Sequence, residues 1–144
     1  MNTQAAHRGR RRGDRGASAL EMSIVAPAFL LLIFVIIEAG LWMYARNVAT
    51  LSAREGASVL RVSGALGDPN AWRASAETTA ESYAQQVGIL SNVTAVASSV
   101  DAEGKVTVTV TGTFTDLVPF FGSTVSSSIT VEVEQFEPDP GQAQ

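Results

Sequence analysis

The residues of this chain whose type and spacing could do chemistry are Gly16 and Glu21. Glu21 lies five residues after the glycine and directly before an apolar run, Met22–Ile37, that contains no charged residue. A carboxylate in a membrane-spanning segment costs free energy, about 2.5–3.5 kcal/mol at the centre of a span and less near its edge. Pairing with a cation offsets that cost. We therefore expect Glu21 either to have a partner or to lie hydrated in the inner headgroup zone.

The side chains that usually perform catalysis or hold metals are scarce in this sequence. Its only histidine, His7, lies in the arginine-rich leader, and cysteine is absent. The chain therefore cannot build a Ser-His-Asp triad or a His/Cys metal cluster, and it has no Walker-type phosphate loop. The outer carboxylates are expected on helix surfaces and strand edges, in water. We expect a protein that is not an enzyme and has no cofactor, metal or small-molecule substrate.

The apolar run is long enough to cross a membrane. About 20 apolar residues span a bilayer core of about 30 Å, which places the span at residues 22–41. Trp42, Tyr44 and Arg46 follow at the outer boundary, where aromatic and basic residues anchor a span. Glu38 lies within about one turn of that boundary. We expect its side chain to snorkel or to face a neighbouring protein.

Charge is distributed unevenly along the chain. Residues 1–16 contain five arginines and one aspartate, whereas residues 17–144 contain five basic and thirteen acidic side chains. Arginines before a membrane helix keep that end in the cytoplasm, so the acidic remainder lies outside. A short basic end that precedes a span does not favour nucleic acid as a partner.

Two other interpretations fit part of this pattern. A cleaved secretory signal has an apolar region of about 7–15 residues followed by a small-x-small site. Here the run is longer, and Trp42 stands where a small residue is needed. A plain single-pass anchor fits the run but leaves Glu21 unexplained.

Helical sequence continues beyond the membrane, over residues 45–66. Four alanines recur at a spacing of four from Ala45 to Ala57, and a stripe of small side chains permits close approach of another helix or a sheet. That neighbour is either the protein's own globular part or another subunit. Gly64 and Gly67 are expected to end the helix.

A second helix is predicted from Asp68 to Val87. Asp68 is a good N-cap, Pro69 suits the first helical position and Gly88 is a suitable C-terminal stop. The core face is expected to contain six residues at helical spacing: Trp72, Ala76, Thr79, Ala80, Tyr83 and Val87.

Beyond Gly88 the apolar period changes from helical to alternating. Strands are predicted at 92–100, at 106–111 and at 125–133, with a turn at 101–104. The apolar segment Leu117–Gly122 separates the second strand from the third. We expect this segment to cap the core. Contact with a partner or with the membrane surface are the other possibilities.

Together these elements predict an α+β fold. A long N-terminal transmembrane helix extends outside the membrane and is followed by a second amphipathic helix and a small three-stranded antiparallel sheet, whose apolar face needs a helix to cover it. The expected divisions are a basic leader (1–16), the transmembrane helix (17–44), its extracytoplasmic continuation (45–66), a small α+β domain (67–136) and a disordered tail (137–144).

Several of these motifs resemble those of a known family. Gly16, four further residues, Glu21 and the apolar run resemble the processing site of type IV prepilins. More narrowly, residues 15–21, 38–40, 44–46 and 53–57 resemble TadE-like proteins, which are pseudopilins or minor pilin-like components of the tight-adherence (Flp) pilus machinery. The C-terminal half resembles these proteins only in being a small variable extracytoplasmic domain.

One residue departs from the family pattern. Members of this group often have an aromatic residue directly after the glutamate, whereas this chain has Met22. The difference weakens the match to a major Flp pilin more than the match to a TadE-like protein. The length of the chain also favours a TadE-like protein, because major Flp pilins consist of little more than the N-terminal helix.

The resemblance implies how the chain is processed and where it works. A membrane-embedded prepilin peptidase would cut between Gly16 and Ala17 and leave Glu21 as the fifth residue of the mature chain. The implied fold is pilin-like. The implied location is a bacterial inner membrane, crossed once with the N-terminus in the cytoplasm. The implied partners are the lipid bilayer, the peptidase, other pilin-like subunits and the pilus assembly platform.

The expected function is assembly of a tight-adherence pilus or a related secretion apparatus, as a minor pilin or pseudopilin. The alternative is a membrane-anchored adaptor whose outer domain binds a partner without any filament. In the first case, cleavage would create a free amine at Ala17, one helical turn from Glu21. The carboxylate could then pair with the amine of its own chain or with that of a neighbouring subunit.

Overall fold

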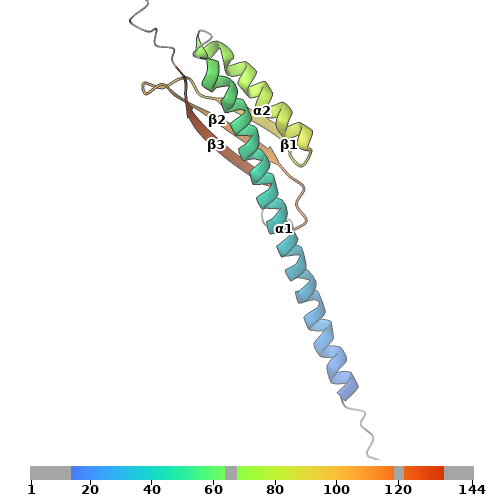
Figure 1. The fold of residues 1–144 in the computed structure, drawn as a ribbon. Coiled ribbons are helices and arrows are strands. Elements are labelled where there is room, and N and C mark those ends of the chain that lie inside the picture. The colour runs from blue at the N-terminus through green and yellow to red at the C-terminus, as the bar shows by residue number, and fades with distance from the viewer. Residues whose placement is uncertain (1–13, 64–67, 119–121, 135–144) are drawn as a thin grey trace, which may run out of the picture. The chain divides into compact units, whose positions relative to one another are not determined.

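The computed structural model describes residues 14–63, 68–118 and 122–134. Within these residues the chain forms two α-helices, a short 3-10 helix and three strands (Figure 1). In chain order they are α1 (Asp14–Ser63), the 3-10 helix (Pro69–Trp72), α2 (Arg73–Val87), β1 (Ser91–Ala97), β2 (Lys105–Thr113) and β3 (Thr124–Glu132). The predicted α+β fold, with a long N-terminal helix, a second helix and a three-stranded antiparallel sheet, is confirmed.

The chain divides into two units, Met1–Ile37 and Glu38–Gln144, which are described separately. In the first unit α1 continues through Pro27. Its apolar side chains are exposed in successive turns, Leu20, Ile24, Phe29 and Ile36 among them. A helix that is apolar all round is typical of a membrane span. α1 is long and apolar enough to cross a membrane, with a mean hydropathy of 2.6 over an 18-residue window.

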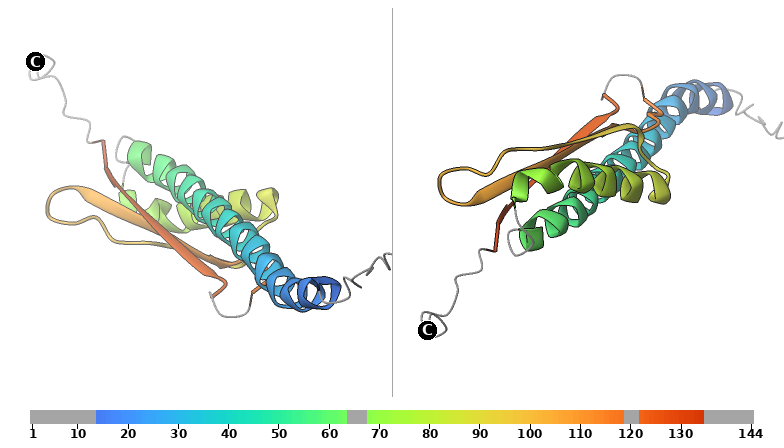
Figure 2. Two further views of the ribbon diagram at one scale, coloured as in Figure 1. Left: turned by 90° about the horizontal axis from the view of Figure 1, so that it is seen from below. Right: turned by 90° about the horizontal axis from the view of Figure 1, so that it is seen from above.

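In the second unit the strands form an antiparallel sheet in the order β1-β2-β3. Val106, Val108 and Val110 of β2 are buried on one face, because successive side chains of a strand point to opposite faces. α2 and the end of α1 cover this valine face (Figure 2). On the other face hydroxyl groups pair across β2 and β3 at 2.8–3.1 Å: Thr107 with Thr130, Thr109 with Ser128, and Thr111 with Ser126.

The pairing of β2 with β3 determines which backbone groups of β3 remain free. Val133 N–H donates to Gly104 O at 2.9 Å. Antiparallel pairs alternate along a ladder between bonded and non-bonded positions. The even-numbered residues of β3, such as Ser126 and Ser128, therefore direct their backbone N–H and C=O away from β2. Among the described residues no side chain bonds to these outward groups.

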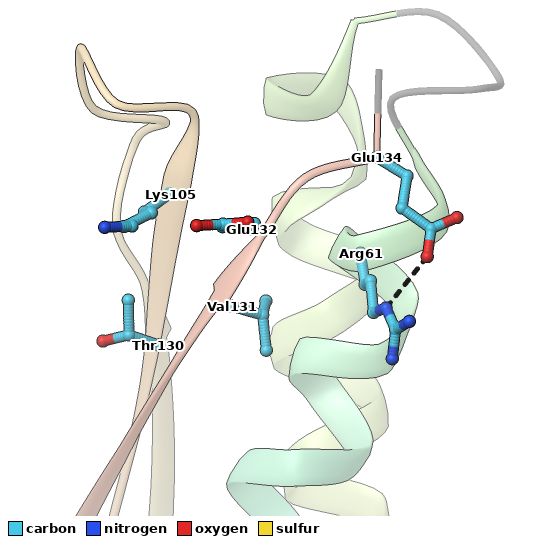
Figure 3. Close-up of a pocket in the computed structure, with 6 residues that line it drawn as sticks. All are labelled: Arg61, Lys105, Thr130, Val131, Glu132 and Glu134. Carbon is cyan, nitrogen blue, oxygen red and sulfur yellow. Dashed lines mark hydrogen bonds and ion pairs between the residues drawn. The ribbon is translucent and has the colours of Figure 1, made fainter. Parts of the chain in front are cut away.

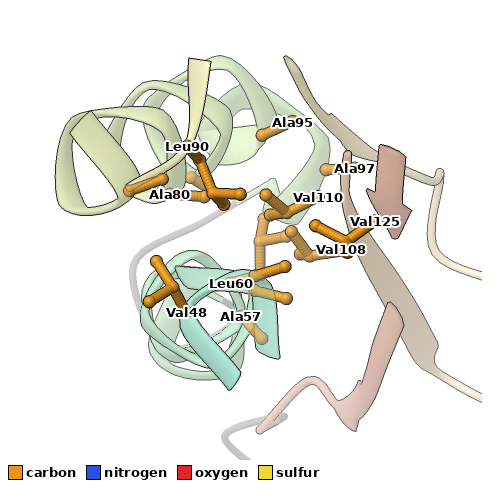
Figure 4. Packing of buried hydrophobic residues seen from close by; sticks show 14 of the residues in the cluster. Val48, Ala57, Leu60, Ala80, Leu90, Ala95, Ala97, Val108, Val110 and Val125 are labelled. Carbon is orange, nitrogen blue, oxygen red and sulfur yellow. The ribbon is translucent and has the colours of Figure 1, made fainter. Parts of the chain in front are cut away.

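The hydrophobic core lies between the valine face of the sheet and the two helices. Leu60 of α1 is fully buried there. Figure 4 shows this side chain beside the β2 valines. Other members of the same cluster are Val48, Ala80, Leu90, Ala95, Ala97 and Val125.

The ends of the second helix follow the predicted signals, with one shift. The Asp68 carboxylate accepts the backbone N–H of Asn70 at 2.9 Å and so caps the first turn. That turn is a 3-10 helix, so α2 begins at Arg73 rather than at the cap. Gly88 ends the helix with φ of +77° and donates its N–H to Ala84 O at 3.3 Å. Glycine adopts this left-handed conformation without a steric penalty.

Two details of the sequence prediction are wrong. On the core face of α2 the predicted Ala76 and Ala80 are buried and Trp72 packs against the core, but Val87 is 38% exposed and Ala84, which was not predicted, is buried. Small side chains occupy this face because α1 packs closely against it. The first strand ends at Ala97 rather than at residue 100, since the chain turns where Asp101 accepts the N–H of Lys105 at 2.7 Å.

Some predicted features lie outside the described residues. These are the leader up to residue 13, the helix-ending Gly64 and Gly67, the middle of the apolar segment 117–122 and the tail 137–144.

Candidate functional site

The expected processing and assembly residues lie on one continuous helix. Gly16, Ala17 and Glu21 all fall within α1. Residues four apart are neighbours on a helix surface, so positions 17 and 21 share one side of α1. The side chain of Glu21 is exposed. Its carboxylate is therefore accessible to a group outside this chain.

Glu38 is the one buried charged residue in the part of the chain that the structure describes. Its side chain is 3% exposed. Oε2 accepts the backbone N–H of Leu117 at 2.8 Å. Oε1 is buried and has no hydrogen-bond partner among the described residues. The sequence suggested snorkelling or a neighbouring protein, whereas the structure pairs Glu38 with a backbone amide of its own chain.

The three expected interfacial anchors lie on the surface of α1. Trp42 is 40% exposed and Tyr44 is 51% exposed. The guanidinium carbon of Arg46 lies 5.3 Å from the centroid of the Trp42 ring, which is cation–π geometry. The arginine and the tryptophan therefore form one amphipathic group at the end of the apolar run.

The stripe of small residues on α1 packs within the chain. Ala45, Ala49, Ala53 and Ala57 are buried in the core. A Cβ added to Gly56 would lie 2.8 Å from Ala76 O and 2.9 Å from Ala80 Cβ of α2. At Gly56, α1 and α2 are therefore so close that only a residue without a Cβ fits between them. Of the two neighbours considered from the sequence, the protein's own globular part is the one that the stripe contacts.

Comparison with known families identifies the N-terminal part of the chain. Residues 16–58 match the family model described as TadE-like protein. This segment is TadE-like. No curated protein and no solved structure matches the chain. The family match over these residues confirms the resemblance expected from the sequence.

The TadE-like segment contains the residues singled out on α1, from Gly16 through Glu21 and Glu38 to Gly56. Proteins of this family are typically structural rather than catalytic. In the described part of the chain no group of three or more His, Cys, Asp or Glu residues is placed to hold a metal ion.

Beyond the TadE-like segment, α2 carries polar contacts that the sequence analysis missed. Glu77 accepts Ala97 N–H at 2.8 Å, and Glu81 accepts Ala95 N–H at 3.0 Å. The guanidinium of Arg73 donates to Ala97 O, with its Nε at 3.0 Å. These three side chains are half-buried rather than solvated, which corrects the expectation for the helix-surface carboxylates. Their spacing of four along one helix face was the signal that could have found them.

The end of α1, beyond the TadE-like segment, borders an open surface pocket of about 480 Å³. Figure 3 shows its lining, in which Arg61 of α1 faces Glu134. The Arg61 Nε lies 3.0 Å from Glu134 Oε1, and both side chains are more than half exposed. An ion pair exposed to water contributes little to stability, typically about 0–1 kcal/mol. We assign this pocket no chemistry.

Proposed function

We propose that this chain is a TadE-like minor pilin or pseudopilin that takes part in the assembly of a tight-adherence pilus or a related secretion apparatus. The observation that carries the proposal is the TadE-like match, which begins at Gly16 and includes Glu21 and the apolar run. In this role the chain crosses the bacterial inner membrane once, with its N-terminus in the cytoplasm and its α+β domain outside. The exposed apolar part of α1 supports a membrane anchor.

Processing by a prepilin peptidase is the first step of the proposed function. The cut falls between Gly16 and Ala17 and removes the arginine-rich leader. Three features support it: the glycine, the glutamate five residues later and the apolar run that follows. The leader arginines keep this end on the cytoplasmic side before the cut.

The new amine of Ala17 then gives Glu21 a charged partner. Glu21 is exposed on α1 and lies one turn from Ala17. In an assembly of helices the carboxylate meets the amine of a neighbouring subunit, and this pairing offsets the cost of a carboxylate at the membrane edge. The contact sets the register of one subunit on the next.

Contacts with other subunits use surfaces that the folded domain leaves exposed. The alanine stripe of α1 is buried against α2 and β2, so it is not available for packing between subunits. The apolar residues before Glu38 remain exposed and supply the helix surface for other pilin-like subunits in the membrane.

N-terminal mass spectrometry of the protein from its native cells tests this proposal. The expected mature chain begins at Ala17. Gly16→Trp is expected to block maturation, because a large side chain occupies the position before the cut. Gly13→Trp, a matched change at another leader glycine, should leave maturation normal. A mature protein that retains residues 1–16 would contradict the proposal and favour the membrane-anchored adaptor.

A further inference from the structure

The two edges of the sheet differ in how their backbone groups are satisfied. At the β1 edge, side chains of α2 bond to the outward backbone groups, as Glu77 does to Ala97 N–H at 2.8 Å. At the β3 edge, no hydrogen bond among the described residues reaches the outward groups of Thr124–Glu132. α1 closes this edge only beyond the strand, where Glu134 N–H donates to Arg61 O at 2.9 Å. The edge of β3 itself is therefore open.

β3 also lacks the devices that usually protect an edge strand. It pairs with β2 over nine residues in one unbroken register, without a bulge, and it contains no proline and no lysine. A long regular edge of this kind is a template to which another strand can add. The backbone groups of Ser126, Ser128 and Thr130, which point away from β2, are those that such a strand would use.

The surface on either side of this edge can receive side chains. On the valine face, Ile129 and Val131 are only half-buried. The open pocket of about 480 Å³ lies at the same edge. Figure 3 shows Val131 and Arg61 on one side of β3 and Thr130 on the other. The pocket is thus a widening beside the strand, and an added strand would cover the half-buried side chains.

The side of α1 that adjoins β3 is basic. Thr50 Oγ1 lies 2.8 Å from Ser127 Oγ, and this contact identifies that side of the helix. Residues four positions away, or three turns further on, share the same side. They include Arg46, Arg54 and Arg61, which are three of the five basic residues that follow the leader. The positive charge of a mostly acidic domain is therefore concentrated beside the open edge.

Arg54 is the arginine of this row that has no charged or aromatic partner among the described residues. Arg46 lies 5.3 Å from the ring of Trp42, and Arg61 is paired with a carboxylate at 3.0 Å. Arg54 is exposed and lies along α1 between Thr50 and Arg61, the two residues that contact the β3 segment. A carboxylate on an added strand would supply the opposite charge at this position.

A second copy of this chain fits the edge poorly. Its own open edge is β3, and the residues of β3 on the valine face carry no acid. Pairing of β3 with β3 about a two-fold axis would also bring the arginine rows of the two copies towards each other. Like charges that face each other across an interface disfavour association. The charges favour a different, acidic chain.

We propose that the β3 edge binds an extended acidic segment of another protein by strand addition. The backbone of that segment pairs with the outward groups of β3. On the valine face its carboxylates meet Arg54, and its apolar side chains cover Ile129 and Val131. All of these residues belong to the unit Glu38–Gln144. The site goes beyond the proposed function, because it requires neither the cleavage after Gly16 nor a pilus.

Binding of a designed peptide to the full chain tests the proposal. The probe has nine residues, the length of β3, with threonine at alternate positions and glutamate or valine at the positions between. It carries a fluorescein label, and the chain is held in dodecylmaltoside micelles. Fluorescence anisotropy gives the Kd, and hydrogen exchange followed by NMR locates the peptide on the chain.

The exchange pattern is specific to strand addition. In the free chain the outward amides of Ser126, Ser128 and Thr130 should exchange faster than those of Ser127 and Ile129, which bond to β2. The peptide should slow the outward amides by about tenfold or more and leave the inward amides nearly unchanged. The absence of binding, or binding without this slowing, would overturn the proposal.

Two variant peptides separate backbone pairing from charge. N-methylation of the residues whose N–H would face β3 should abolish binding, because main-chain hydrogen bonds hold an added strand. Replacement of every glutamate by lysine should weaken binding at low salt. Equal affinity of the N-methylated peptide would exclude strand addition, and equal affinity of the lysine peptide would exclude an acidic partner.

Substitutions in the chain test the arginine and the edge separately. Arg54→Gln should weaken binding about two- to fivefold, whereas Ser75→Glu, an equal change of net charge at an exposed position of α2, should not. Ser128→Pro removes an outward N–H without breaking a bond to β2 and should prevent binding, whereas Ser128→Ala keeps that N–H. Unchanged affinity in Arg54→Gln would contradict the charge contact. Unchanged affinity in folded Ser128→Pro would contradict the pairing, and if that variant does not fold the N-methylated peptide decides.

Sedimentation of the chain without peptide tests the second copy as the occupant. The mass of the protein in each micelle should correspond to one chain over the concentration range of the binding assay. Dimers that form with rising concentration and protect the amides of Ser126, Ser128 and Thr130 would make the second copy the occupant and overturn the proposal.

Discussion

The carboxylate of Glu77 on α2 accepts the backbone N–H of Ala97 at the edge of β1, at 2.8 Å. Three side chains of α2, Arg73, Glu77 and Glu81, close the β1 edge with bonds of this kind. Ser98 N–H donates to Thr107 O, so by the alternation of an antiparallel ladder the groups of Ala97 point away from β2. An edge strand with free backbone groups is a template for unwanted pairing. Here side chains of α2 bond to the outward backbone groups of β1 and so prevent such pairing.

Replacing Glu77 by alanine should therefore destabilise the outer domain. The Ala97 amide is part-buried at this contact, and loss of its charged acceptor costs about 1–3 kcal/mol. Thermal unfolding of the full chain in detergent, followed by circular dichroism, measures the loss. Glu55→Ala at an exposed position of α1 is the control. Equal melting temperatures for the two variants would show that the β1 edge gains nothing from Glu77.

The close approach of α1 and α2 predicts an unusual response to a glycine substitution. Gly56→Ala would bring a methyl group within 2.8 Å of Ala76 O, which forces the helices apart and costs about 1–3 kcal/mol. Gly40→Ala is the matched control, because a Cβ at that position meets nothing within 4 Å. The melting temperature should fall only in the first variant. A normal melting temperature for Gly56→Ala would mean that the two helices separate without cost.

The end of α2 depends on a left-handed residue. Gly88 has φ of +77°, and a residue such as alanine costs about 1–2 kcal/mol in this conformation. We expect Gly88→Ala to lower the unfolding free energy by that amount and Gly88→Asn to lower it less, because asparagine tolerates this conformation. Denaturant titration of the three proteins gives the ranking. An alanine variant as stable as the parent would contradict it.

Glu21 is predicted to act in assembly rather than in maturation. Glu21→Ala should be cut normally after Gly16, because the residues around the bond are unchanged, but should assemble poorly with other pilin-like subunits. Mass spectrometry checks the cut, and recovery of sheared pili checks assembly. Glu21→Asp retains the charge and should recover part of the assembly. Unchanged pilus formation by Glu21→Ala would remove the proposed contact with the neighbouring Ala17.

Local sequence signals were sufficient for most of the fold. Alternating valine and threonine predicted β2, and Asp68 and Gly88 predicted the ends of the second helical segment, because each of these signals acts within a few residues. The TadE-like resemblance was also carried by local motifs.

Long-range contacts could not be predicted in the same way. The partner of Glu38 is Leu117, 79 residues away, and it depends on how the sheet packs on α1. The same holds for Glu77, whose role follows from the strand order and from the side of the sheet that α2 covers. The small-residue stripe was visible in the sequence, but its neighbour became clear only when α2 and β2 were in place.

The paired hydroxyls on the outer face of the sheet determine how that face responds to salt in the surrounding solution. The three rungs, from Thr107–Thr130 to Thr111–Ser126, carry no formal charge. The charged pair of the ladder, Lys105 opposite Glu132, lies at one end of the strands. Salt screens charges but leaves neutral hydrogen bonds largely unaffected. The binding of water, or of any other partner, to these hydroxyl pairs should therefore change little with salt concentration.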